Sequence, residues 1–185
     1  MYFFYYIFID VSYPPGKAGG FLAKNWGDDT TSRLHELSYE LHSKLSEELN
    51  LTSYRQLPTM EVTRGSRSNK RKLESEMAVS WLDKGGVTEV MDALHTAQVC
   101  PMELTTKLME AAVSFGSTVI YGRVCGLCSN KKSDGKDIVS GVRYTVTGQS
   151  EDIVLTATKV VIATGPWSGV HAQDWLGVDI PMQVS

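Results

Sequence analysis

Two cysteines, Cys125 and Cys128, have the Cys-x-x-Cys spacing of redox dithiols and of half a zinc site. A redox pair normally lies at a helix N-terminus, where the thiolate is stabilised. The sequence predicts a β-strand here instead, and residues three apart on a strand face opposite sides. A zinc site would need two more ligands, and neither Cys100 nor His95 is close in sequence. We interpret the pair as structural. A small dithiol redox module is the alternative, and it predicts a cysteine of low pKa in a thiol titration.

Other polar groups suggest less specific chemistry. Five basic residues lie between Arg64 and Lys72 without interleaved aromatic residues, which favours a solvated hairpin tip over a nucleic-acid patch. His35 and His42 lie seven residues apart and share one face of a predicted helix. Neither has a carboxylate or thiol at ligand spacing, so we expect both on the surface or flank of that helix. No Ser-His-Asp or paired-carboxylate pattern indicates a hydrolase.

Composition is that of an ordinary globular domain. The 185 residues are 42% hydrophobic and 21% charged, with a net charge of −3 that does not suggest a nucleic-acid partner. Three clustered cysteines are too few for a disulfide framework, which favours a reducing, cytoplasmic location. The apolar run at residues 1–9 is shorter than the ~20 residues of a membrane span and lacks a basic leader. We expect no membrane span.

The elements that must position these residues begin with a helix over residues 28–50. Leucines recur every three or four residues along it, so it should bury an apolar face. Asp28 and the three residues after it offer N-terminal capping groups, and Asn50 is a plausible stop. A second helix is predicted over residues 101–115, because Pro101 suits a first helical turn.

Between and after these helices the pattern is largely of short strands. We expect strands at 54–63, interrupted at Pro58, and at 76–82, joined by the polar loop 64–72. A short helix over 87–94 and an extended segment 96–100 should follow. From residue 118 onward the predicted strands are 118–121, 123–129, 138–146, 153–156 and 159–163.

The last of these runs differs from the others. Residues 160–163 are continuously apolar, as in a strand covered on both faces of a parallel sheet, and they end in Thr164-Gly165-Pro166. In open α/β sheets ligands bind beyond the carboxyl ends of such strands, and glycine lets the backbone approach a ligand closely. A nucleotide site is therefore expected at this end of the strand.

Three segments, in order, resemble the D-amino-acid-oxidase-like (DAO) FAD-dependent oxidoreductases, in particular a fungal and plant branch. Residues 159–168 (KVVIATGPWS), followed by 176–181 (LGVDIP), resemble the late flavin-binding strand and turn. Residues 98–127 resemble the helix and strand whose valine contacts the adenine. Residues 16–23 (GKAGGFLA) resemble the glycine-rich segment that wraps the FAD.

This resemblance implies an α/β fold: a partial FAD-binding, Rossmann-like domain (residues 16–50 and 95–185) with part of an antiparallel substrate-domain sheet (51–94), after an atypical segment 1–15. It implies FAD as cofactor and an amine or amino-acid substrate. Its implied cofactor-binding residues are Gly16, Lys17, Ala18, Gly19, Gly20, Arg123, Val124, Ala163, Thr164, Gly165 and Trp167. Tyr54, Arg55 or Trp81 could meet the substrate, and no catalytic residue is assigned.

The sequence also departs from the family pattern. Family members begin with a strand, a G-x-G-x-x-G turn and a helix that hold the pyrophosphate, and no such motif occurs here. Pro15 stands where the family usually has Ser or Thr, and only Asp10 could replace the acidic residue that binds the ribose. We therefore expect a truncated form in which residues 1–15 replace the usual start. A catalytically inactive fragment with a scaffold role is the alternative.

Overall fold

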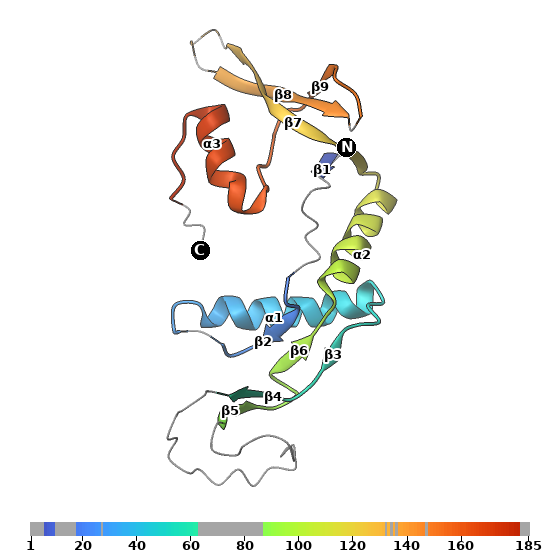
Figure 1. The fold of residues 1–185 in the computed structure, drawn as a ribbon, viewed down its shortest axis with the longest axis vertical. Coiled ribbons are helices and arrows are strands. Elements are labelled where there is room, and N and C mark those ends of the chain that lie inside the picture. Colours follow the sequence, from blue (N-terminus) through green and yellow to red (C-terminus); the bar gives the residue numbers. More distant parts are fainter. Residues whose placement is uncertain are drawn as a thin grey trace. The chain divides into compact units, whose positions relative to one another are not determined.

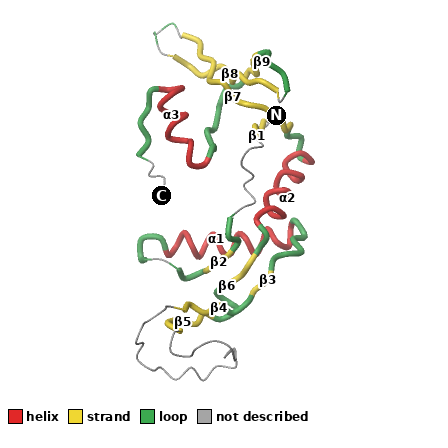
Figure 2. The backbone as a smooth tube through the Cα atoms, viewed as in Figure 1, coloured by secondary structure: helices red, strands yellow, loops and turns green. Residues whose placement is uncertain are grey.

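The computed structural model describes residues 6–9, 18–26, 28–62, 87–131, 133, 135, 137–146 and 148–181 (Figure 1, Figure 2). The chain forms two compact units. Residues 14–115 make one, here called the helix unit, and residues 1–13 with 116–185 make the other, here called the sheet unit. This division does not test the predicted assignment to cofactor and substrate domains, which stays a prediction.

The helix unit is built on two small antiparallel sheets. β2 (Phe21–Ala23) and β3 (Arg55–Gln56) flank β6 (Thr96–Gln98), while β4 (Thr59–Val62) pairs with β5 (Val87–Met91). α1 (Ser32–Glu48) packs against β2, and α2 (Pro101–Ser114) follows β6. The core of this unit includes five buried residues: Tyr39, Leu51, Thr96, Ala97 and Val99.

The two long helices predicted over residues 28–50 and 101–115 are confirmed as α1 and α2. Before α1, one carboxylate oxygen of Asp28 accepts hydrogen bonds from the Thr30 and Thr31 amides and from the Thr31 hydroxyl. After α1, Asn50 adopts a left-handed conformation with φ of 52°, which suits asparagine. α2 begins at Pro101, as its missing N–H predicts.

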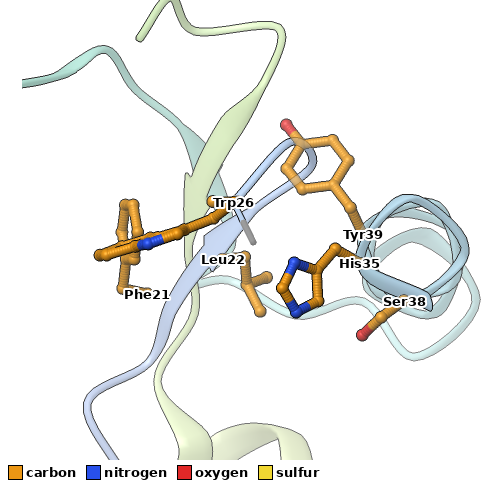
Figure 3. Close-up of a pocket in the computed structure, with 7 residues that line it drawn as sticks. Phe21, Leu22, Trp26, His35, Ser38 and Tyr39 are labelled. Carbon is orange, nitrogen blue, oxygen red and sulfur yellow. The ribbon is translucent and has the colours of Figure 1, made fainter. Parts of the chain in front are cut away.

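The leucine face of α1 differs from the expectation. Leu34, Leu37 and Leu41 are 65%, 54% and 48% exposed, whereas Tyr39 is buried. The helix turns a different side toward β2, the side that carries His35, Ser38 and Tyr39 (Figure 3). Within the described part of the chain, no element covers the three leucines.

The short helix predicted over residues 87–94 is wrong. Residues 87–91 form strand β5, whose register pairs Met91 with Thr59 and Val90 with Met60. Val87 and Val90 are β-branched, and a partner strand 25 or more residues earlier in the chain decides the conformation. The predicted break at Pro58 is confirmed, since β3 and β4 lie on either side of it. The predicted strand 76–82 and loop 64–72 lie outside the described residues.

The sheet unit is a four-stranded sheet in the order β1-β7-β8-β9. β1 (Tyr6–Ile9) pairs in parallel with the start of β7 (Thr118–Lys131). β8 (Asp137–Val146) and β9 (Asp152–Thr156) continue the sheet as an antiparallel meander. The two strands predicted at 118–121 and 123–129 are thus one strand, with register irregularities at 124/126 and 128/129.

The strand predicted over Lys159–Ala163 is wrong. This segment has no strand partner among the described residues, and Val161 is 87% exposed. A strand exists only through hydrogen bonds to a neighbour, so apolar composition alone could not decide its state. It leads into a single 3-10 turn, η3 (Gly165–Trp167), and then α3 (Ser168–Leu176), which ends at Gly177 with φ of 66°.

Candidate functional site

The glycine-rich segment lies at the start of the helix unit. Gly16 and Lys17 are outside the described residues, while Ala18 and Gly19 are exposed. Gly20 has φ of 74°, and its carbonyl oxygen accepts a hydrogen bond of 2.9 Å from the Val99 amide. A Cβ added at Gly20 would collide with the Val99 carbonyl oxygen, whereas one added at Gly19 would meet nothing within 4 Å. Gly20 therefore has a structural role, and Gly19 presents open backbone to a ligand.

A half-buried carboxylate holds the start of α2, which follows the Val99 that Gly20 contacts. Glu103, in the first turn of α2, accepts hydrogen bonds of 2.8 Å from the Thr52 amide and hydroxyl and of 2.9 Å from the Ser53 amide. The Ser53 hydroxyl in turn accepts a 2.8 Å hydrogen bond from the Cys100 amide. Hydrogen bonds from Ser53 and Thr52 lower the pKa of Glu103 from its usual 4.5 to about 2. The ionised carboxylate thus ties the start of α2 to the loop after α1.

The predicted flavin-binding turn at the end of residues 159–168 forms one compact turn around Thr164 in the sheet unit. The Thr164 amide donates to the Ser168 hydroxyl at 3.1 Å, and the Thr164 hydroxyl lies 3.0 Å from His171 Nδ1. The His171 ring stacks on Trp175 with centroids 4.4 Å apart and an interplanar angle of 2°. Both polar groups of Thr164 are therefore engaged inside the turn.

The rest of this turn is open. Ala163 and Gly165 are exposed, and Trp167 is 44% exposed. Gly165 has φ of 58° and no atom within 4 Å of an added Cβ, so a ligand could approach its backbone. Arg123 and Val124 are in the same unit, on β7, where Val124 is opposite Tyr144 and Arg123 is opposite Thr145. Arg123 is exposed and Val124 half-buried.

The structure thus brings Ala163, Thr164, Gly165 and Trp167 together and places the glycine segment in the other unit. Gly19 and Gly165, each considered within its own unit, leave space beside the backbone that a side chain would fill, which fits close approach by a cofactor such as a flavin. The Thr164 amide is already used by the Ser168 hydroxyl, whereas the Thr164 hydroxyl, which can donate one hydrogen bond and accept two, keeps capacity for a further contact.

The three suggested substrate residues have different outcomes. The Arg55 guanidinium donates to the Gln98 side chain at 2.7 Å, so it is held along the β3–β6 pair. The Tyr54 hydroxyl is buried without a hydrogen-bond partner among the described residues. Trp81 lies outside those residues. None of the three is shown to face a substrate.

Cys125 and Cys128 are free thiols of intermediate exposure on β7. The Cys125 thiol lies 3.6 Å from the Arg123 carbonyl oxygen, to which it donates a weak hydrogen bond. Among the described residues, no group of three or more His, Cys, Asp or Glu side chains could hold a metal ion.

Sequence reasoning missed a cavity in the helix unit. It has a volume of about 360 Å³ and lies between β2 and α1, lined by Phe21, Leu22, Ala23, Trp26, His35, Ser38 and Tyr39 (Figure 3). His35 was expected on the surface or flank of the helix; it is half-buried, lines this cavity, and its Nδ1 is buried without a hydrogen-bond partner among the described residues. The signal available in the sequence was the face shared by His35, Ser38 and Tyr39, but nothing in the sequence places β2 opposite that face.

A family model described as FAD dependent oxidoreductase (DAO) matches residues 15–185. The chain belongs to the DAO family of FAD-dependent oxidoreductases. The match spans the glycine-rich segment, β7 and the turn at Thr164, so the predicted family resemblance is confirmed. The fold class is confirmed too, as a mixed α/β chain that corresponds to part of a DAO-type fold.

One curated protein and two solved structures resemble the chain at low sequence identity. A Schizosaccharomyces pombe protein whose name assigns it to the oxidoreductases is 27% identical over 166 residues, which are 83% of this chain and 43% of that protein. L-proline dehydrogenase from P. horikoshii superposes with a TM-score of 0.66 at 19% identity, over 91% of this chain and 46% of that one. L-amino acid deaminase from Proteus vulgaris superposes with a TM-score of 0.64 at 17% identity, over 90% of this chain and 42% of that one.

These structural likenesses concern the fold. The chain spans less than half the length of each of these three relatives. Across its described residues, the DAO-family chain has no helix with the length and apolar character required to cross a membrane.

Proposed function

We propose that this chain is part of an FAD-dependent oxidoreductase that acts on the C–N bond of an amine or amino acid. The match of the DAO model over residues 15–185 carries the proposal. The names of two structural neighbours, an L-amino acid deaminase and an L-proline dehydrogenase, support an amino-acid substrate. We assign residues 16–50 and 95–185 to the cofactor domain and 51–94 to the substrate domain.

FAD, when bound, would accept a hydride from the carbon that carries the substrate amine. The residues proposed to hold it are the glycine-rich segment Gly16, Lys17, Ala18, Gly19 and Gly20, the β7 pair Arg123 and Val124, and the turn residues Ala163, Thr164, Gly165 and Trp167. Open backbone at Gly19 and Gly165 supports the two glycine contacts. The buried contact of Gly20 with Val99 supports a positioning role for that residue.

A second function is favoured by a specific observation. The 185 residues contain no G-x-G-x-x-G motif, whose backbone N–H groups and following helix hold a pyrophosphate. The alternative that we propose is that these 185 residues, taken by themselves, do not hold FAD and have a scaffold or interaction role.

An absorbance scan of the purified chain separates the two functions. The chain is measured as isolated and after incubation with excess FAD followed by desalting. The oxidoreductase proposal predicts visible flavin absorbance close to one FAD per chain. A Gly19→Leu variant, which fills the open space at Gly19, should retain less flavin. Ser150→Leu, an exposed change in the turn between β8 and β9, should retain as much as the unchanged chain.

A folded chain that retains no flavin would favour the inactive form. If flavin is retained, a panel of amines and amino acids then tests turnover by the decrease of flavin absorbance under anaerobic conditions. Retained flavin that no member of the panel reduces would contradict the proposed substrate class.

A further inference from the structure

The cavity between β2 and α1 has the features of a small-molecule site. Its volume of about 360 Å³ falls in the range of about 300–1,000 Å³ that is typical of ligand pockets. All seven lining residues belong to the helix unit, so its geometry does not depend on how the two units are placed. None of them is among the residues proposed to hold FAD.

Three of its seven lining residues, Phe21, Trp26 and Tyr39, carry large aromatic rings. The Phe21 and Trp26 rings meet edge to face, with centroids 5.2 Å apart and an interplanar angle of 73°. Trp26 is 57% exposed, so a large apolar ring surface lies open to solvent beside the cavity. The Tyr39 ring lines the opposite side, and its hydroxyl points away from His35 and accepts a 3.2 Å hydrogen bond from the Gln56 side chain (Figure 3). A flat aromatic ligand would cover this surface and gain ring–ring contacts.

His35 supplies the polar group. Its Nδ1 has no hydrogen-bond partner among the described residues, and an unsatisfied buried nitrogen is unfavourable. Ser38 adds a hydroxyl to the lining, and this hydroxyl keeps its own donor, because His42 Nδ1 donates to the Ser38 carbonyl oxygen at 2.7 Å and lies 3.5 Å from the hydroxyl. A neutral imidazole offers one acceptor nitrogen and one N–H donor, and rotation of the ring about its Cβ–Cγ bond can turn either edge toward the cavity. A ligand with a single N–H or O–H group could therefore be bound by the acceptor nitrogen.

Charges beside the cavity disfavour an anion. Lys24 follows the lining residue Ala23, and its ammonium lies 3.0 Å from Glu40 and 3.5 Å from Glu36. These two carboxylates are next in sequence to the lining residues Tyr39 and His35. Two carboxylates thus face one ammonium, which leaves no uncompensated positive charge in this group for a carboxylate or phosphate ligand.

We propose that this cavity binds a neutral heteroaromatic molecule of one or two fused rings that carries one N–H donor. The rings lie against Phe21, Trp26 and Tyr39, and the donor bonds to the His35 imidazole. The proposal does not rest on FAD binding, since it uses only side chains of the helix unit.

Ligand-observed saturation-transfer NMR on the full 185-residue chain tests it, with indole and 1-methylindole as a matched pair of probes. Both probes have the same ring system, but only indole has the N–H. Indole should bind about fivefold to tenfold more tightly, as expected for one hydrogen bond. In His35→Phe the two probes should bind equally. Trp26→Ala should weaken both at least tenfold, and Leu34→Ala, an exposed change beside His35, should leave both unchanged.

Equal affinity of the two probes for the unchanged chain would overturn the proposal, as would the absence of saturation transfer. Full binding to Trp26→Ala would also overturn it, because the signal would then come from another site. Retained 1-methylindole binding in His35→Phe shows that the cavity of that variant is intact. If that variant loses both probes, the comparison of indole with 1-methylindole on the unchanged chain still decides the outcome.

Discussion

Gly19 and Gly20 are neighbours in the sequence but differ in what surrounds them. Both belong to the segment that resembles the flavin-wrapping loop of the DAO family. Gly20 has a positive φ and lies against the Val99 carbonyl and the Pro101 ring, whereas Gly19 has open space where a side chain would project. At the residue scale, one glycine is required by the fold and the other is available to a ligand.

Gly20→Ala should therefore destabilise the helix unit, by at least about 1–2 kcal/mol from the left-handed backbone alone. The clash with the Val99 carbonyl oxygen adds to this cost. Gly19→Ala is the control and should change the free energy of unfolding by less than about 0.5 kcal/mol. Urea denaturation followed by circular dichroism measures both. Equal stability of the two variants would show that the Gly20 contact is dispensable.

Glu103→Gln should weaken the link between α2 and the loop after α1. The folded-state pKa of Glu103, about 2, is below the usual 4.5, so its ionisation stabilises the fold above pH 4.5. That contribution is lost as the pH falls from 4.5 toward 2. The variant should be less stable than the unchanged chain at pH 7, and the difference should shrink below pH 4.5.

Glu110→Gln is the matched control on the same helix, since Glu110 is exposed and, among the described residues, its ion pair is with Lys107. Thermal unfolding at pH values from 3 to 7, monitored by circular dichroism, compares the three proteins. A stability difference for Glu103→Gln that does not vary with pH would contradict the role of the ionised carboxylate.

At the scale of the element, α1 carries two different faces. Tyr39, on the face toward β2, is 5% exposed, and burial is the main reason that the pKa of its phenol is raised. The leucine stripe that predicted the helix is instead exposed at Leu34, Leu37 and Leu41. The first three leucines that identify the helix in the sequence are thus not the residues that hold it in the helix unit, whereas Leu45 and Leu49 are half-buried.

This difference predicts a large loss of stability for one substitution on α1 and almost none for another. Tyr39→Ala should cost about 3 kcal/mol or more, since it removes a buried aromatic ring. Leu37→Ala should change the free energy of unfolding by less than about 0.5 kcal/mol. Chemical denaturation with circular dichroism compares them. A large loss for Leu37→Ala would mean that the leucine face is covered in solution.

At the scale of the whole molecule, an exposed and unpaired segment with apolar side chains favours association between chains. Residues 159–163 have no strand partner among the described residues, and Val161 is 87% exposed. An unpaired apolar segment can hydrogen-bond to another chain, which favours association. The exposed leucines of α1 add apolar surface of the same kind.

We therefore expect poor solubility for the isolated chain, improved by Val161→Lys without loss of stability. Light scattering after size-exclusion chromatography measures association, and denaturation measures stability. Val142→Lys is the contrasting variant, because Val142 is 5% exposed and should not tolerate a charge. A monodisperse, cooperatively unfolding monomer before any substitution would contradict the expectation.

The sequence by itself determined the family, the two long helices with Asn50 after the first and Pro101 at the start of the second, and strands within residues 118–131, 137–146 and 152–156. These features depend on local periodicity, on turn and capping residues, and on short motifs. Only the tertiary structure decided that residues 87–91 form a strand, that residues 159–163 have no strand partner among the described residues, and that His35 lines a cavity. It also showed Glu103 bonded to Thr52, 51 residues earlier. Each of these outcomes depends on contacts between residues far apart in the chain, and local pattern contains no information on which distant segment supplies the partner.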